Sequence, residues 1–134
     1  MGKYNVNEGN QLGYMPTEFD NDGNLVETKI VAGADLKAGQ VVYLSGNMEV
    51  SPTTAASKAV LGVAMFDCKK GDPIAVECEG LFKLKASGAI TAGAQVESAA
   101  GGEVAAAGTT VTKAIGIALN TAAKGDGVFV KFSI

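Results

Sequence analysis

The repeated tripeptide Lys-Gly-Asp is the feature of the sequence whose residue types could do chemistry. It occurs at Lys70-Gly71-Asp72 and again at Lys124-Gly125-Asp126, 54 residues further along the chain. Two carboxylates that flank a bond can cleave it by acid and base catalysis, as in glycosidases. The same residues are typical of tight turns, because glycine permits a positive φ and aspartate hydrogen-bonds nearby backbone. Since both copies have this turn-forming setting, we interpret Gly71, Asp72, Gly125 and Asp126 as structural turn residues.

Glutamate and cysteine are the other candidate groups. Glu49 and Glu103 each precede a valine in a predicted hairpin arm, which favours solvent-facing strand positions. Cys68 and Cys78 lack the short spacing of a metal site. Cys78 takes the inward position that Phe132 holds 54 residues later, so we expect a small buried hydrophobe there. Cys68 is expected in a loop and exposed, and a disulfide between the two is disfavoured in a reducing compartment.

The absence of whole residue types excludes several classes of function. The sequence contains no histidine, which is the usual general base near neutral pH and the commonest metal ligand. It contains no arginine either, and a net charge of −3 argues against a nucleic-acid partner. The glycine-rich stretches lack the spacing of phosphate-binding or dinucleotide-binding loops. We therefore predict no enzyme activity, no metal and no cofactor.

Hydropathy gives no sign of a membrane partner. No apolar run approaches the ~20 residues of a membrane-spanning helix. The first residues, MGKYNVNEGN, also lack the hydrophobic segment of a signal peptide. We expect the protein to be made and kept in a cytoplasm-like compartment, or to be released by lysis.

The elements that must position these residues are predicted to be β-strands. The chain of 134 residues is 47% hydrophobic but only 6% aromatic, and it contains 18 glycines. A core of this kind is built from Val, Ile, Leu and Ala, and it favours short strands joined by tight turns. In the C-terminal segment Val128, Val130, Phe132 and Ile134 alternate with more exposed positions, and in residues 74–79 Ile74, Val76 and Cys78 alternate with Ala75, Glu77 and Glu79. One face of each strand is expected to be buried, and the other to be wet or covered by a partner.

An internal repeat organises these strands. Aligned without a gap, residues 32–80, here called the first unit, match residues 86–134, the second unit, at 12 of 49 positions. The identical pairs are Ala32/Ala86, Ala38/Ala92, Gly39/Gly93, Val42/Val96, Glu49/Glu103, Val50/Val104, Gly62/Gly116, Ala64/Ala118, Lys70/Lys124, Gly71/Gly125, Asp72/Asp126 and Val76/Val130. Two copies of a ~54-residue β unit predict an all-β fold, a small barrel or sandwich over residues 30–134 with a pseudo-twofold closed sheet.

Residues 1–29 differ from the rest of the chain. They are rich in asparagine and glycine and show no strand or helix periodicity, which is also typical of a solvated tail. Four apolar side chains are spaced along this segment: Tyr4, Tyr14, Met15 and Phe19. We expect an extended N-terminal arm that lies on a neighbouring protein through these residues.

The order of short motifs in residues 30–134 resembles a known family. These motifs are Ala38-Gly39, Gly46, Leu61-Gly62-Val63-Ala64, Gly71-Asp72, Ile74-Ala75-Val76-Glu77, Gly80-Leu81-Phe82, Ala92-Gly93 and Ile115-Gly116. They are similar to those of the small capsid decoration, or cement, proteins of tailed bacteriophages.

This resemblance implies a structural virion protein. It implies a β-barrel, commonly a homotrimer, that binds the outside of a phage head and stiffens the capsid by bridging subunits of the major capsid protein. Such a protein would be assembled in the cytoplasm of the host bacterium. A ligand-binding or host-surface adhesion module remains the alternative, although such sites usually need aromatic platforms and tryptophan is absent.

Overall fold

The computed structural model is all-β, as the sequence predicts. It describes residues 17–19, 25–27, 29–57, 59–108 and 113–133, and in these ranges the only helical segment is a 3-10 turn, η1 (Ala100–Gly102). The strands are β1 (Thr17–Phe19), β2 (Leu25–Glu27), β3 (Val31–Ala32), β4 (Val41–Gly46), β5 (Glu49–Pro52), β6 (Val60–Ala64), β7 (Val76–Glu77), β8 (Glu79–Lys85), β9 (Gln95–Ser98), β10 (Val104–Ala106), β11 (Ala114–Ala118) and β12 (Gly127–Ser133).

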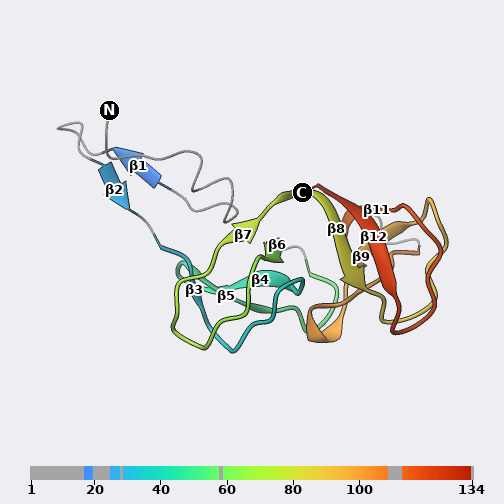
Figure 1. Ribbon diagram of the computed structural model, residues 1–134, viewed down its shortest axis with the longest axis horizontal. Coiled ribbons are helices and arrows are strands. Elements are labelled where there is room, and N and C mark those ends of the chain that lie inside the picture. The colour runs from blue at the N-terminus through green and yellow to red at the C-terminus, as the bar shows by residue number, and fades with distance from the viewer. Residues whose placement is uncertain (1–16, 20–24, 28, 58, 109–112, 134) are drawn as a thin grey trace.

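Two five-stranded sheets form the body of the molecule (Figure 1). The first sheet has the order β3-β5-β4-β6-β7, and the second has the order β10-β9-β11-β12-β8. All neighbours are antiparallel except β3 and β5. The chain crosses from the first sheet to the second at Cys78, between β7 and β8. The described strands therefore make a two-sheet, sandwich-like arrangement, and the single closed sheet that we considered from the repeat is wrong.

Backbone contacts of the first unit recur 54 residues later. The bridges and hydrogen bonds that recur in this way are Leu36 with Cys68 and Ile90 with Ala122, Ala32 with Val50 and Ala86 with Val104, and Gly39 with Ala64 and Gly93 with Ala118. A one-residue shift would turn every side chain of a strand to the other face, so this agreement in register is demanding. The contacts support the duplication that the sequence predicts.

The alternation of buried and exposed residues holds for β12 and fails for β7. Val128, Val130 and Phe132 are buried, while Phe129 and Lys131 are exposed. In residues 74–76, by contrast, Ile74, Ala75 and Val76 are all buried. Ala75 was expected on the outer side, and it is buried because the first sheet is covered on both of its faces. Ile134 lies outside the described residues.

The core is divided into two clusters that do not follow the two sheets evenly. The smaller cluster belongs to the first unit and its leading strand: Ile30, Ala32, Leu36, Val42, Val50, Ala64, Ile74 and Val76. The larger cluster contains the inner side chains of the second sheet and also Val41, Val60 and Val63 of the first. These three valines belong to β4 and β6, on the side opposite Val42 and Ala64. One face of the first sheet thus packs on its own unit, and its other face packs on the second unit.

Buried polar groups fasten the two units together. The Thr53 hydroxyl donates to the carbonyl of Ala99 at 2.8 Å, and the Ser98 hydroxyl donates to the carbonyl of Ala55 at 2.8 Å. Ser98 also accepts a hydrogen bond from the backbone N–H of Ser57. These bonds join the loop after β5 to the end of β9, so the units are held by specific contacts as well as by apolar burial.

The N-terminal segment is described only as a hairpin of β1 and β2. Thr17 pairs with Glu27, and Phe19 pairs with Leu25. Figure 1 shows this hairpin beyond β3, apart from both five-stranded sheets. Phe19 of the expected arm lies in β1, whereas Tyr4, Tyr14 and Met15 lie outside the described residues.

Candidate functional site

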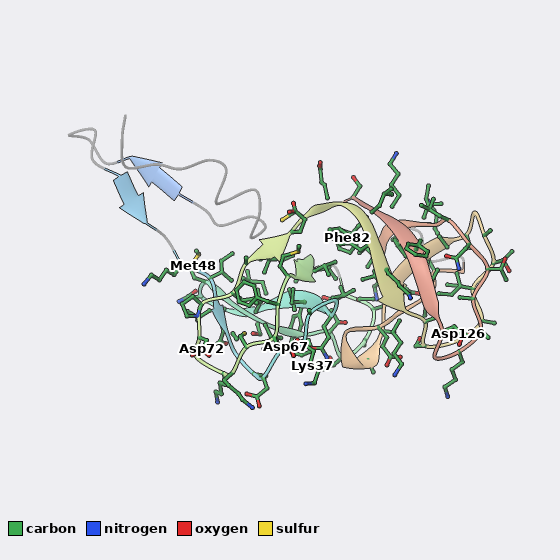
Figure 2. The ribbon with its side chains drawn as sticks, in the orientation of Figure 1. Lys37, Met48, Asp67, Asp72, Phe82 and Asp126 are labelled. Carbon is green, nitrogen blue, oxygen red and sulfur yellow. The ribbon has the colours of Figure 1, made fainter. Side chains whose placement is uncertain are left out.

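The repeated carboxylates lie in turns, far from each other. Gly71 and Gly125 adopt φ values of 91° and 87°, a region that favours glycine. Asp72 accepts a hydrogen bond from the N–H of Lys69 at 3.3 Å, which closes its turn. Asp72 and Asp126 are at opposite ends of the two-sheet body (Figure 2). They cannot flank one substrate bond, so paired carboxylate catalysis does not fit this geometry.

Both cysteines are free and half-buried. Burial raises the pKa of the Cys78 thiol, and the neighbouring carboxylates of Glu77 and Glu79 raise it further. Burial also raises the pKa of Cys68, with Asp72 as the next cause. The expectations of a fully buried Cys78 and an exposed Cys68 are therefore wrong. Cys78 is less covered than Phe132 because the first unit lacks the strand that covers that position in the second unit.

Metal and membrane sites find no support in the described part of the chain. Within these ranges no three His, Cys, Asp or Glu residues gather closely enough to hold a metal ion. No described helix is long and apolar enough to cross a membrane.

A groove of about 410 Å³ lies where the two units meet. Lys37, Lys83 and Lys85 line it together with backbone of the 3-10 turn, and Figure 2 shows Lys37 beside this junction. The ammonium group of Lys85 lies 3.6 Å from a carboxylate oxygen of Glu103, and the amide of Gln40 donates to the carbonyl of Gly101. The groove is thus crossed by contacts between the units, which makes it a structural seam.

The feature best suited to binding is the outer face of the second sheet. Four large apolar side chains are exposed on it, and they are Leu81, Ile117, Leu119 and Phe129. They come from β8, β11, the residue after β11, and β12, which lie side by side. We call this set the outer face.

Strand register places these side chains together. Lys131 of β12 pairs with Leu81 on one side and with Ile117 on the other. Phe129, two residues before Lys131, pairs with Lys83, and its carbonyl accepts a hydrogen bond from the N–H of Leu119 at 2.7 Å. Paired residues point to the same side of a sheet. The outer face is therefore a continuous apolar surface that carries two lysines.

The equivalent face of the first sheet is covered. Val63 and Ala75, which correspond to Ile117 and Phe129, are 1% and 0% exposed. Phe129 itself is 49% exposed and Leu81 is 66% exposed. Sequence reasoning placed Phe129 on a wet or partner-covered side but did not single out the outer face. The usable signal was the large apolar residues at the polar positions of the alternation.

Comparison with known proteins agrees with this architecture. The fold is that of a two-sheet β protein whose exposed apolar surface is a sheet face. The sequence matches the family model described as phage cement protein over residues 21–134, and the chain belongs to that family. It is therefore a structural protein of the phage virion, associated with the capsid.

A solved structure shares the fold. The crystal structure of the head fiber gp8.5 N base in bacteriophage phi29 is similar to this chain with a TM-score of 0.60 and 20% sequence identity. The similarity covers 79% of this chain and 92% of that chain. A comparison with curated proteins found no match.

Proposed function

We propose that the protein binds the outer surface of a phage head and stabilises the capsid by bridging subunits of the major capsid protein. Membership of the cement protein family supports this proposal. The observation that carries it is the outer face, because large exposed apolar surfaces on soluble domains mark sites of protein binding. A protein with this role needs a rigid body and several binding surfaces, and it needs no catalytic centre.

Two parts of the chain would share the work. The N-terminal arm, residues 1–29, would reach the major capsid protein or an adjacent decoration subunit through Tyr4, Tyr14, Met15 and Phe19. The duplicated domain, residues 30–134, would form the oligomer, which the family resemblance suggests is a homotrimer. Bridging follows from this division, because one oligomer carries several arms to several capsid subunits. The protein would then sit on the capsid exterior after assembly in the host bacterial cytoplasm.

Reconstitution on undecorated heads tests the proposal. Purified protein is added at increasing concentration to heads that lack it, and bound protein is measured after sedimentation. Saturable binding together with a higher temperature of DNA release is the expected result. The absence of binding to heads of the parent phage would overturn the proposal.

A deletion of residues 1–15 tests the role of the arm. Head binding is expected to fall sharply while the circular dichroism spectrum and the melting temperature of the body stay unchanged. Unchanged head binding by the shortened protein would contradict the assignment of capsid contact to the arm.

A further inference from the structure

The two units pack in the same direction, one behind the other. The face of the first sheet that carries Val41, Val60 and Val63 is buried in the cluster of the second unit, which includes Ile115 and Phe132. A symmetric pairing would bury the same face of both sheets. Here the second unit contributes its inner side and keeps the equivalent face uncovered, so the contact between units is heterologous.

A heterologous contact leaves one unsatisfied surface at each end. At the end of the second unit this surface is the outer face, which corresponds to the covered face of the first sheet. Gln95 and Ile117 occupy the places of Val41 and Val63 and are both exposed.

The other unsatisfied surface is a rim on the first unit, formed by Leu61 and Cys78. Both side chains are partly exposed, whereas Ile115 and Phe132, their counterparts in the second unit, are 2% and 1% exposed. The ring of Phe82 from β8 packs edge-on against Phe132 with ring centroids 6.0 Å apart. No such cover is described on the first unit.

Strand pairing explains why the rim is open. β8 pairs with β12 along seven residues, from Gly127 with Lys85 to Ser133 with Glu79. The corresponding segment of the first unit, residues 25–31, makes the equivalent bridge between Val31 and Pro73. Residues 25–27 then pair with β1 instead of continuing along β7. The side of the core next to Leu61 and Cys78 is therefore not covered by that strand.

We propose that the outer face of one molecule docks on the rim of a second copy of this chain, repeating between molecules the contact that joins the two units within one. Charge favours this match, because Lys83 and Lys131 accompany the outer face while Glu77 and Glu79 flank Cys78. The inference rests on the self-association included in the proposed function, and it names the surfaces and their polarity. Each molecule contributes one outer face and one rim.

Disruption of the outer face tests the proposal first. Molar mass is measured across a concentration series by sedimentation equilibrium for the wild type, for I117E/F129E and for the control L44E. Leu44 is 50% exposed, as is Leu119, but it lies in β4 of the first sheet. The wild type and L44E are expected to self-associate, and I117E/F129E is expected to remain monomeric with an unchanged melting temperature.

Complementation tests the polarity. A C78K variant, altered at the partly exposed rim, is also expected to be monomeric with an unchanged melting temperature. An equimolar mixture of C78K and I117E/F129E should form a one-to-one dimer, because one variant keeps its outer face and the other keeps its rim. Two variants that destroy one symmetric interface would not rescue each other.

Three results would overturn the inference. They are a wild type that stays monomeric at every concentration, an I117E/F129E variant that associates like the wild type, and a mixture that fails to form the dimer. Head binding is measured on the same samples. A wild type that is monomeric but loses head binding on I117E/F129E substitution would assign the outer face to the capsid, while self-association without head binding would contradict the proposed function and leave this inference standing.

Discussion

Gly62 and Gly116 occupy the same place in the two units, and each lies against a carbonyl oxygen of the neighbouring strand. A Cβ atom at Gly62 would collide with the carbonyl of Glu77, and a Cβ atom at Gly116 would collide with the carbonyl of Lys131. Valine side chains, Val76 and Val130, close the same two spaces. Glycine is required here by the close approach of β6 to β7 and of β11 to β12.

Substitution of either glycine by alanine is expected to destabilise the protein. Because the atom that the new methyl group meets is backbone, the strands must separate, and we expect a loss of about 1 to 3 kcal/mol in the free energy of unfolding. Urea denaturation of G62A and G116A measures this loss. G88A is the matched control, since nothing lies within 4 Å of a Cβ at that position. Equal stability of G62A and G88A would contradict the prediction.

Removal of the Ser98 hydroxyl is expected to weaken the junction between the units. Ser98 is 1% exposed, and S98A would leave the carbonyl of Ala55 and the N–H of Ser57 without this partner. Unsatisfied buried groups of this kind cost about 1 to 3 kcal/mol. The exposed hydroxyl of Ser45, 2.8 Å from that of Ser51, provides the control S45A, which should be near neutral. A thermal melt of S98A that matches that of S45A would show that the junction does not depend on this bond.

Acid is expected to remove a stabilising contribution of Asp35. A hydrogen bond from the backbone N–H of Lys70 and the nearby Lys69 ammonium group lower the pKa of Asp35 from its ordinary value of 3.8. A lowered pKa in the folded state means stability that is present above pH 3.8 and is lost as the pH falls through the folded value. NMR titration of the Asp35 carboxyl group should give a midpoint below 3.8.

The variant D35N shows the same linkage in stability. Its melting temperature should lie slightly below that of the wild type at pH 7 and should converge with it at a pH below the folded pKa of Asp35. A difference between the two proteins that grows as the pH falls would have the wrong sign.

The two thiols are expected to react slowly at neutral pH. Burial is the largest cause that raises the pKa of both Cys68 and Cys78 above 9.0, so the reactive thiolate form is scarce at pH 7. Iodoacetamide labelling followed by intact mass should be slower than for free cysteine, and its rate should keep rising with pH beyond 9. Fast labelling at pH 7 of either single-cysteine variant, C68A or C78A, would contradict this.

The sequence predicted the parts of the fold that depend on local chemistry. The Lys-Gly-Asp motifs at Gly71 and Gly125 are turns with positive φ, and the alternation through Val128, Val130 and Phe132 describes β12 correctly. Both features depend on a residue and its close neighbours, so a single sequence contains the information.

The arrangement of the units could not be predicted in the same way. Ala75 is buried and Phe129 is exposed, although they hold equivalent positions, because the burial of each depends on what lies across the sheet. The 54-residue repeat predicts that two units exist but not that they pack in one direction. The outer face, as a candidate site, follows from that packing, which is a property of long-range contacts.

The double burial of the first sheet has a consequence for synthesis of the protein. The ribosome releases the first unit before the second, and at roughly 5 to 20 residues per second the next 54 residues take roughly 3 to 10 seconds. During that interval Val41, Val60 and Val63 have no cover of their own. The nascent first unit is therefore a chaperone substrate by construction, and a chain terminated near residue 85 would be prone to aggregate.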